Sequence, residues 1–516
     1  MLSKVNSAAL SGLEAMPVSL EINTMAGQTQ SPVFLMVGLP DSAVRESRTR
    51  VESALINSGL HLPQVSVVVN FAPADVKKEG SGYDLPLALG LLAANKLIRQ
   101  EAFEGTMFVG ELGLDGSIRP VRGALPIAIK ARALGFKNLV VPMANAREAG
   151  VVNKLRVFGA ERLSDVVGWL QGKSRLEEAN IDTRSEFLAA DDGSDPDFAD
   201  VKGQQQVKRA CEVAAAGGHN LLLVGSPGCG KSMIAKRIPS ILPKLTMSES
   251  LETTQIHSVA GKLGSGTSLI TRRPFRAPHH TISDVALIGG GSTFQPGEIS
   301  LAHNGVLFLD ELPEFSRQAL ETMRQPLEDR VITVSRAKYS ITLPCSFMLV
   351  ASMNPCPCGY YNHPTRSCTC NPGQRQRYMG RVSGPLLDRI DIQIEVTPVP
   401  VEDLANAPSG EPSSAIRDRV VRAREIQSRR FEGCRGIHCN AQMTDSQLEQ
   451  FARPDSEGAD RLSRAMKALN LSARAYSRIL KVARTIADLD GEERIGARHI
   501  AEAVGYRNLD RSGWGE

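Results

Sequence analysis

The sequence predicts an α/β protein that ends in a helical segment. A short apolar strand at 221–224 enters a loop with glycines from Gly225 onward and then a helix, which is the order of a nucleotide-binding βα unit. Strand-like and helix-like patterns alternate through 1–172, as in α/β domains. From Val401 onward the apolar residues follow a helical period. We therefore expect an α/β domain at 1–172, a linker at 173–198, a second α/β core at 199–400 and a helical lid at 401–516.

Length and composition indicate several domains and no membrane span. A chain of 516 residues is too long for one hydrophobic core. Hydrophobic residues make up 42% and charged residues 22%, as in ordinary soluble proteins. No apolar run reaches the roughly 18 residues of a membrane helix, and the start of the chain lacks the apolar core of a signal peptide. We expect a cytoplasmic protein without a membrane partner, and a net charge of +4 is too small to predict nucleic-acid binding.

The first domain carries short stretches that resemble a known catalytic fold. Residues 78–85, 113–121 and 135–142 resemble the C-terminal domain of Lon-type proteases, in a fold shared with ribosomal protein S5. Strands are predicted at 65–70 and 139–142, and helices at 85–97 and 124–134.

The same resemblance argues against proteolysis. A protease of this type needs a serine nucleophile and a lysine base, and the motifs place these at Gly82 and Leu125. Neither side chain can perform the chemistry, although a shifted alignment would use Ser81 and Lys130. We expect an inactive domain that serves as a scaffold or faces DNA, similar to the one in RadA-type recombination proteins.

The segment 173–198 is polar and aperiodic. It includes an acidic run around Asp191 and Asp195. Such composition buries little surface, so we expect a tether between the domains.

The centre of the chain is a phosphate-binding loop. The stretch following the strand fits G-x-x-x-x-G-K-[ST], whose backbone N–H groups surround a polyphosphate at a helix N-terminus. Lys231 is expected to reach the β- and γ-phosphates and Ser232 to bind Mg²⁺. The expected nucleotide-binding residues of the loop are Gly225, Ser226, Pro227, Gly228, Cys229, Gly230, Lys231 and Ser232.

A second apolar strand, 305–309, ends in two carboxylates. Asp310 is expected to hold Mg²⁺ and Glu311 to polarise the attacking water. Residues 198–204 resemble the adenine-side segment of AAA+ ATPases, which implies contacts from Val201 and Gly203. In that superfamily a polar residue after a third strand orients the water, and Asn354 after 347–353 matches it.

Residues 384–391 are similar to the segment that carries the arginine finger in the magnesium-chelatase and MCM branch of AAA+ proteins. The resemblance assigns Arg389, with Arg381 as the second choice, to the nucleotide of a neighbouring subunit, and thus implies a homo-hexamer. The alternative for Arg389 is a structural ion pair with Asp388 or Asp391.

Residues 471–478 resemble the start of the sensor-2 helix. The resemblance implies that Arg474, or otherwise Arg478, contacts the γ-phosphate bound to its own chain, whereas the alternative is a surface arginine. Further helices of the lid are predicted at 415–430, 444–451, 460–469, 473–489 and 497–504.

Two insertions point to the substrate. A glycine-rich loop at 284–300 carries Phe294, and 329–343 has the alternation of a β-hairpin with Arg336 and Lys338 near its tip. In the magnesium-chelatase and MCM branch such insertions line the pore of a ring. The resemblance implies sequence-independent DNA contacts by Phe294, Arg336 and Lys338, although an exposed turn with two cations is common.

Four cysteines follow Asn354 in two C-x-C pairs. Cys356, Cys358, Cys368 and Cys370 form a plausible Zn²⁺ site, and His363 is an alternative ligand. Free or redox-active thiols are the other interpretation.

The order of these parts is similar to that of the bacterial YifB/ComM family. The resemblance implies an ATP- and Mg²⁺-dependent hexameric helicase that acts on single-stranded and branched DNA, promotes branch migration in natural transformation and cooperates with a recombinase or other recombination proteins. The alternatives are an ATPase that remodels proteins or inserts metal, as chelatase subunits do, and a DNA-binding scaffold without motor activity.

Overall fold

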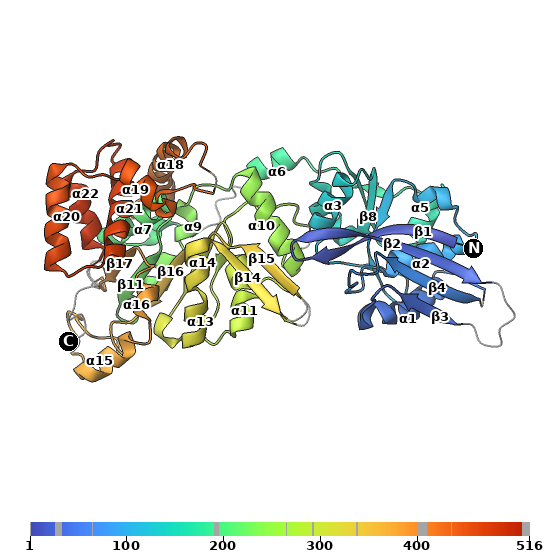
Figure 1. The fold of residues 1–516 in the computed structure, drawn as a ribbon, viewed down its shortest axis with the longest axis horizontal. Helices are drawn as coiled ribbons and strands as arrows, with labels where there is room; N and C mark the ends of the chain where they lie inside the picture. The colour runs from blue at the N-terminus through green and yellow to red at the C-terminus, as the bar shows by residue number, and fades with distance from the viewer. Residues whose placement is uncertain are drawn as a thin grey trace. The chain divides into compact units, whose positions relative to one another are not determined.

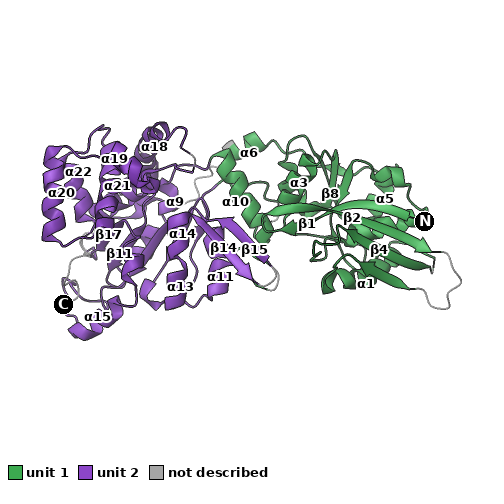
Figure 2. Cartoon of the chain, in the orientation of Figure 1, with its two compact units in different colours: residues 1–191, 246–271, 291–296 green, residues 192–245, 272–290, 297–516 purple. Residues whose placement is uncertain are grey.

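The structure is a computed structural model that divides into two compact units (Figure 2). It describes residues 2–25, 33–63, 65–189, 196–264, 266–291, 294–336, 339–399, 410–434 and 436–507. Unit 1 comprises 1–191, 246–271 and 291–296, and unit 2 comprises 192–245, 272–290 and 297–516.

Unit 1 is built on an eight-stranded mixed sheet with helices packed against it (Figure 1). The strand order is β10-β9-β8-β5-β1-β2-β4-β3. Its elements are β1 (Leu2–Ser11), β2 (Glu14–Met25), β3 (Phe34–Val37), α1 (Ser42–Asn57), β4 (Ser66–Ala72), α2 (Asp84–Ala94), β5 (Thr106–Phe108), β6 (Glu111–Leu112), β7 (Ile118–Arg119), α3 (Ala124–Ala133), β8 (Asn138–Pro142), α4 (Met143–Gly150), β9 (Arg156–Ala160), α5 (Leu163–Leu170), β10 (Glu177–Glu178), α6 (Thr183–Ala189) and α10 (Met247–Ala260).

The predicted strands and helices of the N-terminal part are present as β4, α2, α3 and β8. Helix α2 ends at Ala94, before the expected Leu97, and all of its residues are buried. A helix that is apolar on every side needs cover all round, and α2 obtains it from β1, β2 and α1.

Helix α10 belongs to unit 1 although it lies inside the expected core of 199–400. Its Gln255 side chain donates to the Leu13 carbonyl at 2.6 Å, and the Ser258 carbonyl accepts from the Gly123 amide at 3.1 Å. Met247 and Leu251 pack on the cluster that contains Leu125. The helix therefore completes the hydrophobic core of the N-terminal unit.

The first part of the expected tether is also structured. Strand β10 pairs antiparallel with β9, and Arg156 binds Glu178 at 2.9 Å. Helix α6 follows, and its Glu186 binds Arg147 at 2.7 Å. Glu178 and Glu186 therefore form ion pairs within unit 1, a pattern that composition alone does not distinguish from solvation. The acidic run at 191–195 lies outside the described residues.

Unit 2 contains a five-stranded parallel sheet, a two-stranded hairpin and a C-terminal set of helices (Figure 1). The sheet order is β12-β13-β16-β11-β17. Its elements are α7 (Gln205–Gly217), β11 (Leu221–Gly225), α8 (Lys231–Ala235), α9 (Ile238–Ile241), β12 (Phe275–Arg276), α11 (Asp284–Ile288), α12 (Glu298–Leu301), β13 (Val306–Leu309), α13 (Arg317–Thr322), α14 (Arg324–Asp329), β14 (Val331–Arg336), β15 (Tyr339–Pro344), β16 (Met348–Met353), α15 (Pro372–Met379), α16 (Gly384–Leu387), β17 (Ile392–Val396), α18 (Ser413–Arg430), α19 (Asp445–Phe451), α20 (Ser456–Ala468), α21 (Ala473–Leu489) and α22 (Ala497–Gly505).

The central strands of this sheet are apolar along their whole length. Every residue of β11, β13 and β16 is buried, as expected for parallel strands covered on both faces. Helix α7 packs on β17 and also contacts α18 and α21, so it joins the sheet to the C-terminal helices. The five helices predicted after residue 401 are present as α18 to α22. None of the helices in the described ranges is long and apolar enough to cross a bilayer.

Gly305 sets the spacing between β12 and the strand that delivers Asp310. A Cβ added to Gly305 would lie 2.1 Å from the carbonyl oxygen of Pro274, so the two backbones have no room for a side chain. We expect Gly305→Ala to cost about 2 kcal/mol and to lower the unfolding temperature of unit 2 by roughly 4–8 °C in calorimetry. Gly384→Ala is the control because nothing lies within 4 Å of its added Cβ. Equal unfolding temperatures for the two variants would contradict this packing constraint.

Candidate active site

The phosphate loop connects β11 to α8 at the carboxyl end of the parallel sheet. Gly228 and Gly230 have φ of +79° and +94°, a region in which other residues are strained. A Cβ on Gly225 would lie 2.3 Å from the Val396 carbonyl oxygen of β17. Glycine is therefore required here for close backbone approach as well as for the turn.

Lys231 lies inside the loop and reaches the third predicted strand. Its Nζ donates to the carbonyl oxygens of Gly225 at 2.6 Å and Ser226 at 2.9 Å, and to Oδ1 of Asn354 at 3.2 Å. Strand β16 pairs with β11 in parallel, which brings Asn354 to the same edge as the loop. The ammonium and the amide thus lie where they can act on one phosphate group.

Asp310 is held by two hydroxyl groups. Ser232 donates to its Oδ2 at 2.7 Å, and Ser352 of β16 donates to its Oδ1. The two side chains expected to bind Mg²⁺ are therefore adjacent, and hydroxyl and carboxylate oxygens are the ligands this ion prefers. Sequence reasoning missed Ser352, although a lone serine in an otherwise apolar strand was the available signal.

Glu311 projects into solvent beside a histidine. Its backbone has φ of +54°, its side chain is exposed, and its Oε2 lies 3.5 Å from Nδ1 of His280. His280 is positioned by the rings of His279 and Phe315, at centroid distances of 4.1 and 6.4 Å. His280 thus lies beside the carboxylate expected to polarise water, and the His-His pair after β12 was its only sequence signal.

The expected adenine-side segment contacts the phosphate loop through a residue that sequence reasoning did not single out. Gln204 Nε2 donates to the Cys229 carbonyl at 2.9 Å. Val201 is buried and Gly203 has φ of +64° next to Val399. Both residues therefore lie on the segment that leads to the loop.

Arg389 lies at the opposite edge of the sheet. The Asp391 amide binds the Asn220 carbonyl at 3.1 Å, and Asn220 directly precedes β11, whose other end carries the phosphate loop. Arg389 is 8% exposed and donates to the Pro385 carbonyl at 2.7 Å and to Glu328. Strand β11 spans about 13 Å, so Arg389 faces away from the nucleotide site of its own chain.

Arg474 shares that edge with Arg389. Its guanidinium lies 3.7 Å from Asp388, and both arginines line a cavity of about 610 Å³ with Arg478 and Lys481. Arg474 thus lies at the edge of the sheet opposite the phosphate loop of its own chain, and the γ-phosphate contact that the sensor-2 resemblance implies stays a prediction.

A buried ion pair anchors α21 beneath this cavity. Arg478 binds Asp391 at 2.8 Å, and His219 contacts Asp391 at 3.0 Å and Thr485 at 2.8 Å. Burial opposes the charge of Asp391, but Arg478 and His219 hold its pKa well below the usual range. Burial also lowers the pKa of His219.

Arg381, the second choice for an arginine finger, binds Glu314 at 2.8 Å and lines a different cavity with Glu311 and Asn354.

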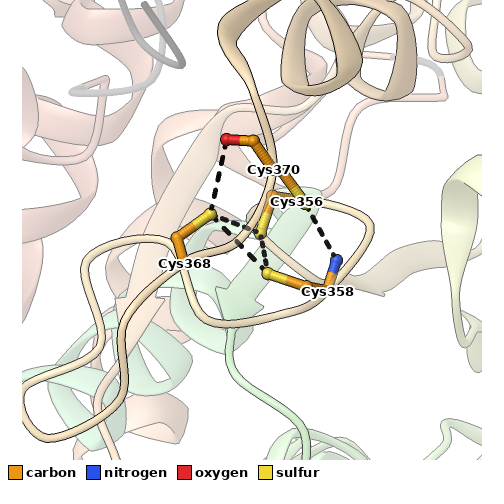
Figure 3. A group of neighbouring side chains, drawn as sticks. All are labelled: Cys356, Cys358, Cys368 and Cys370. Carbon is orange, nitrogen blue, oxygen red and sulfur yellow. Dashed lines mark hydrogen bonds between the residues drawn. The ribbon is translucent and has the colours of Figure 1, made fainter.

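The four cysteines converge immediately after Asn354 (Figure 3). Their sulfur atoms all lie within 4.8 Å of one another, and the group contains no histidine. His363 Nδ1 instead accepts backbone N–H groups from Thr365 at 3.2 Å and Arg366 at 3.1 Å. Although burial opposes ionisation, backbone N–H groups lower the pKa of the Cys358 thiol to about 5, whereas burial raises the pKa of the adjacent Cys356 thiol to about 12.

The predicted hairpin is present as β14 and β15. Arg336 is exposed at its end and pairs in register with Tyr339, whereas Lys338 lies outside the described residues. A Cβ on Gly290 would lie 3.5 Å from the Arg336 guanidinium, so the glycine-rich insertion runs beside the hairpin. Phe294 is half-buried in the part of that insertion that belongs to unit 1.

The positions considered for proteolysis in unit 1 have apolar or paired surroundings. A Cβ on Gly82 would meet Val109 and Val121, and Leu125 is fully buried. The Ser81 hydroxyl donates to Glu111. Lys130 lies on α3, partly exposed.

Comparison with known proteins matches these parts to one family. Profiles described as magnesium chelatase, subunit ChlI, as subunit ChlI of Mg-chelatase and as its ChlI C-terminal part match residues 197–404, 21–145 and 410–507. Competence protein ComM of Haemophilus influenzae is 43% identical over 512 residues, which cover 99% of this chain and 98% of that protein. Proteins named YifB from Escherichia coli and Salmonella typhimurium are 44% and 42% identical, with the same coverage.

The chain belongs to the YifB/ComM family. Its ATPase part is of the magnesium-chelatase type, with ATP and Mg²⁺ as the cofactors that this relationship supports. The matched segment 197–404 contains the phosphate loop, Asp310, Glu311, Asn354 and Arg389, whereas Arg474 lies in the C-terminal match.

We expect Ser352→Ala to weaken Mg²⁺ binding without unfolding the protein. The variant removes one hydrogen bond to the Asp310 carboxylate, and such bonds to charged groups are worth about 1.5–3 kcal/mol. The Mg²⁺ concentration for half-maximal ATP hydrolysis should rise about tenfold or more. Ser300→Ala is the control because Ser300 is equally buried and its hydroxyl has no hydrogen-bond partner among the described residues. An unchanged Mg²⁺ requirement for Ser352→Ala would rule out this positioning role.

Proposed function

We propose that the protein is an ATP-driven hexameric DNA motor that promotes branch migration of recombination intermediates during natural transformation. The observation that carries this proposal is the exposed hairpin bearing Arg336, which is inserted between the two strands that deliver the catalytic side chains. Strand β13 leads to Asp310 and Glu311, and β15 leads through β16 to Ser352 and Asn354. A change at the nucleotide is thus connected by short chain segments to a cation that can bind DNA phosphate.

The chemistry follows from the placement of the site residues. Lys231 and the loop amides would bind the β- and γ-phosphates, and Ser232 with Asp310 would hold Mg²⁺. Glu311, which lies beside His280, would accept the proton of the attacking water while Asn354 orients that water. Bound Mg²⁺ would neutralise charge on the phosphates.

A second chain would complete each site. Arg389 and Arg474 lie on the edge of the sheet opposite the phosphate loop, so in a ring one subunit can present both arginines to the nucleotide of the next. An arginine supplied in this way stabilises the charge of phosphoryl transfer. Head-to-tail contacts that close on themselves give rings, which supports a homo-hexamer.

The DNA part of the proposal rests on charge placement and on the relatives. Phosphate contacts from Arg336, with Lys338 as a further candidate, and stacking of bases on Phe294 would all be independent of sequence. The relative named as a competence protein supports a role with incoming DNA, for which a recombinase or other recombination proteins are candidate partners. The magnesium-chelatase descriptions favour one alternative, an ATPase that remodels a protein or inserts metal.

We expect the full chain to displace strands from forked and three-stranded DNA only while it hydrolyses ATP. Lys231→Ala and Glu311→Gln should abolish displacement, and Arg336→Ala with Lys338→Ala should reduce it at least about tenfold because cations that hold phosphates are lost. Arg461→Ala, which removes an exposed cation on α20, is the matched control. Full unwinding by the hairpin variant would refute the DNA contact, and hydrolysis without any response to DNA would favour the remodelling alternative.

Mixing inactive variants tests which chain supplies the arginines. We expect Arg474→Ala or Arg389→Ala, each inactive alone, to regain ATP hydrolysis when mixed with Lys231→Ala. In a random equal mixture roughly a quarter of the interfaces then join an intact phosphate loop to an intact arginine edge. A mixture of Lys231→Ala with Glu311→Gln is the control and should stay inactive, because both defects lie on one edge. Rescue of Arg389→Ala but not of Arg474→Ala would show that Arg474 acts on the nucleotide bound to its own chain and not on that of the neighbouring chain.

A further inference from the structure

The four cysteines have the spacing of a closed tetrahedral zinc site. The sulfur of Cys356 lies 3.3 Å from that of Cys358 and 3.7 Å from that of Cys368, and the last two are 3.6 Å apart. Four sulfurs at about 2.3 Å from Zn²⁺ would be separated by roughly 3.8 Å. The Cys358 amide donates to the Cys370 sulfur at 3.4 Å, as outer hydrogen bonds to thiolate ligands do. The donor set therefore fits Zn²⁺ in geometry and in chemistry (Figure 3).

The segment that carries these thiols has little else to hold its shape. Residues 354–371 form neither helix nor strand, because β16 ends at Met353 and α15 begins at Pro372. Within 355–371, Pro355, Cys356 and Gly359 alone are buried. An irregular segment of this length with so small a core is typically fixed by a cross-link or a metal ion.

This segment, which we call the cysteine segment (355–371), packs directly on the phosphate loop. A Cβ added to Gly359 would lie 2.5 Å from Cδ of Pro227, so the cysteine segment contacts the phosphate loop with no room for a side chain. The Gly359 amide donates to the Cys356 carbonyl at 3.0 Å, which ties the contact to a thiol-bearing residue. The other end of the connection is covalent, because Cys356 follows Asn354, the partner of Lys231, by two residues.

The cysteine segment also lines a cavity beside the residues expected to act on the nucleotide. Cys358 and Cys370 line a cavity of about 860 Å³ together with Glu311, Asn354, Arg377 and Arg381. Displacement of the cysteine segment would therefore alter both its contact with the phosphate loop and the surroundings of the attacking water.

We propose that Cys356, Cys358, Cys368 and Cys370 bind one Zn²⁺ ion and that this ion holds the phosphate loop in its nucleotide-binding form through the contact of Gly359 with Pro227. Nucleotide affinity then depends on a metal that never touches the nucleotide. The coupling rests on the nucleotide-binding part of the proposed function and is independent of any action on DNA.

The experiment measures metal content and nucleotide affinity on the full chain. Elemental analysis of wild type should give one zinc per chain, and titration with a fluorescent ATP analogue should give its Kd. Gly359→Ala should keep the zinc but raise the Kd at least about fivefold, since the added methyl group would displace the cysteine segment from Pro227. Gly433→Ala is the matched control: its φ of +83° is close to the +82° of Gly359, but nothing in the described part of the chain lies within 4 Å of its added Cβ. Its Kd should stay at the wild-type value.

Removal of the metal provides a second, independent variable. Wild type stripped of zinc by a chelator, and still folded by circular dichroism, should show the same rise in Kd, and added Zn²⁺ should reverse it. Folded wild type without zinc would overturn the metal site. Zinc present with an unchanged Kd in both Gly359→Ala and the stripped protein would overturn the coupling alone. Wild type that holds zinc but binds no nucleotide would overturn the proposed function and, with it, the coupling.

Discussion

The parallel register of β11 with β16 and β17 is the constraint from which the chemistry of unit 2 follows. Parallel strands end at one edge of a sheet, so the phosphate loop, Asp310 and Asn354 meet there without any long connection. The same register sends Arg389 to the other edge, which carries the start of β17. One sheet thus separates the groups expected to bind a nucleotide from Arg389 and Arg474, which lie at its other edge.

The buried pair of Asp391 and Arg478 connects that second edge to the C-terminal helices. His219 bridges Asp391 and Thr485 of α21 directly before the strand that leads to the phosphate loop. A charged group buried this deeply is retained only if its partner stays in place, because separation leaves a charge in a medium of low polarity. Helix α21 is therefore fixed to the base of β11, and the arginines at the start of that helix move with the sheet.

The sequence predicted the site residues that lie in local motifs, and missed those that act through distant neighbours. Lys231 and Asp310 follow directly from short patterns in which chain spacing determines the role. Ser352 and His280 were missed because a hydroxyl in β16 and an imidazole after β12 gain their roles only from side chains on other strands. The position of Arg474 depends in the same way on distant neighbours, since α21 is held by a buried ion pair. Most helices and strands were predictable because their apolar periodicity is strong, whereas the membership of α10 in unit 1 depends on a partner surface far away in the chain.

The insertion of α10 into unit 1 means that neither unit is a continuous piece of the gene. The chain passes between the units five times, near residues 191, 245, 271, 290 and 296. Truncation of the first 190 residues would leave the apolar face of α10, with Met247 and Leu251, without its cover. A cut or an exchange at residue 191 alone would therefore divide the hydrophobic core of unit 1 between two separate pieces of chain.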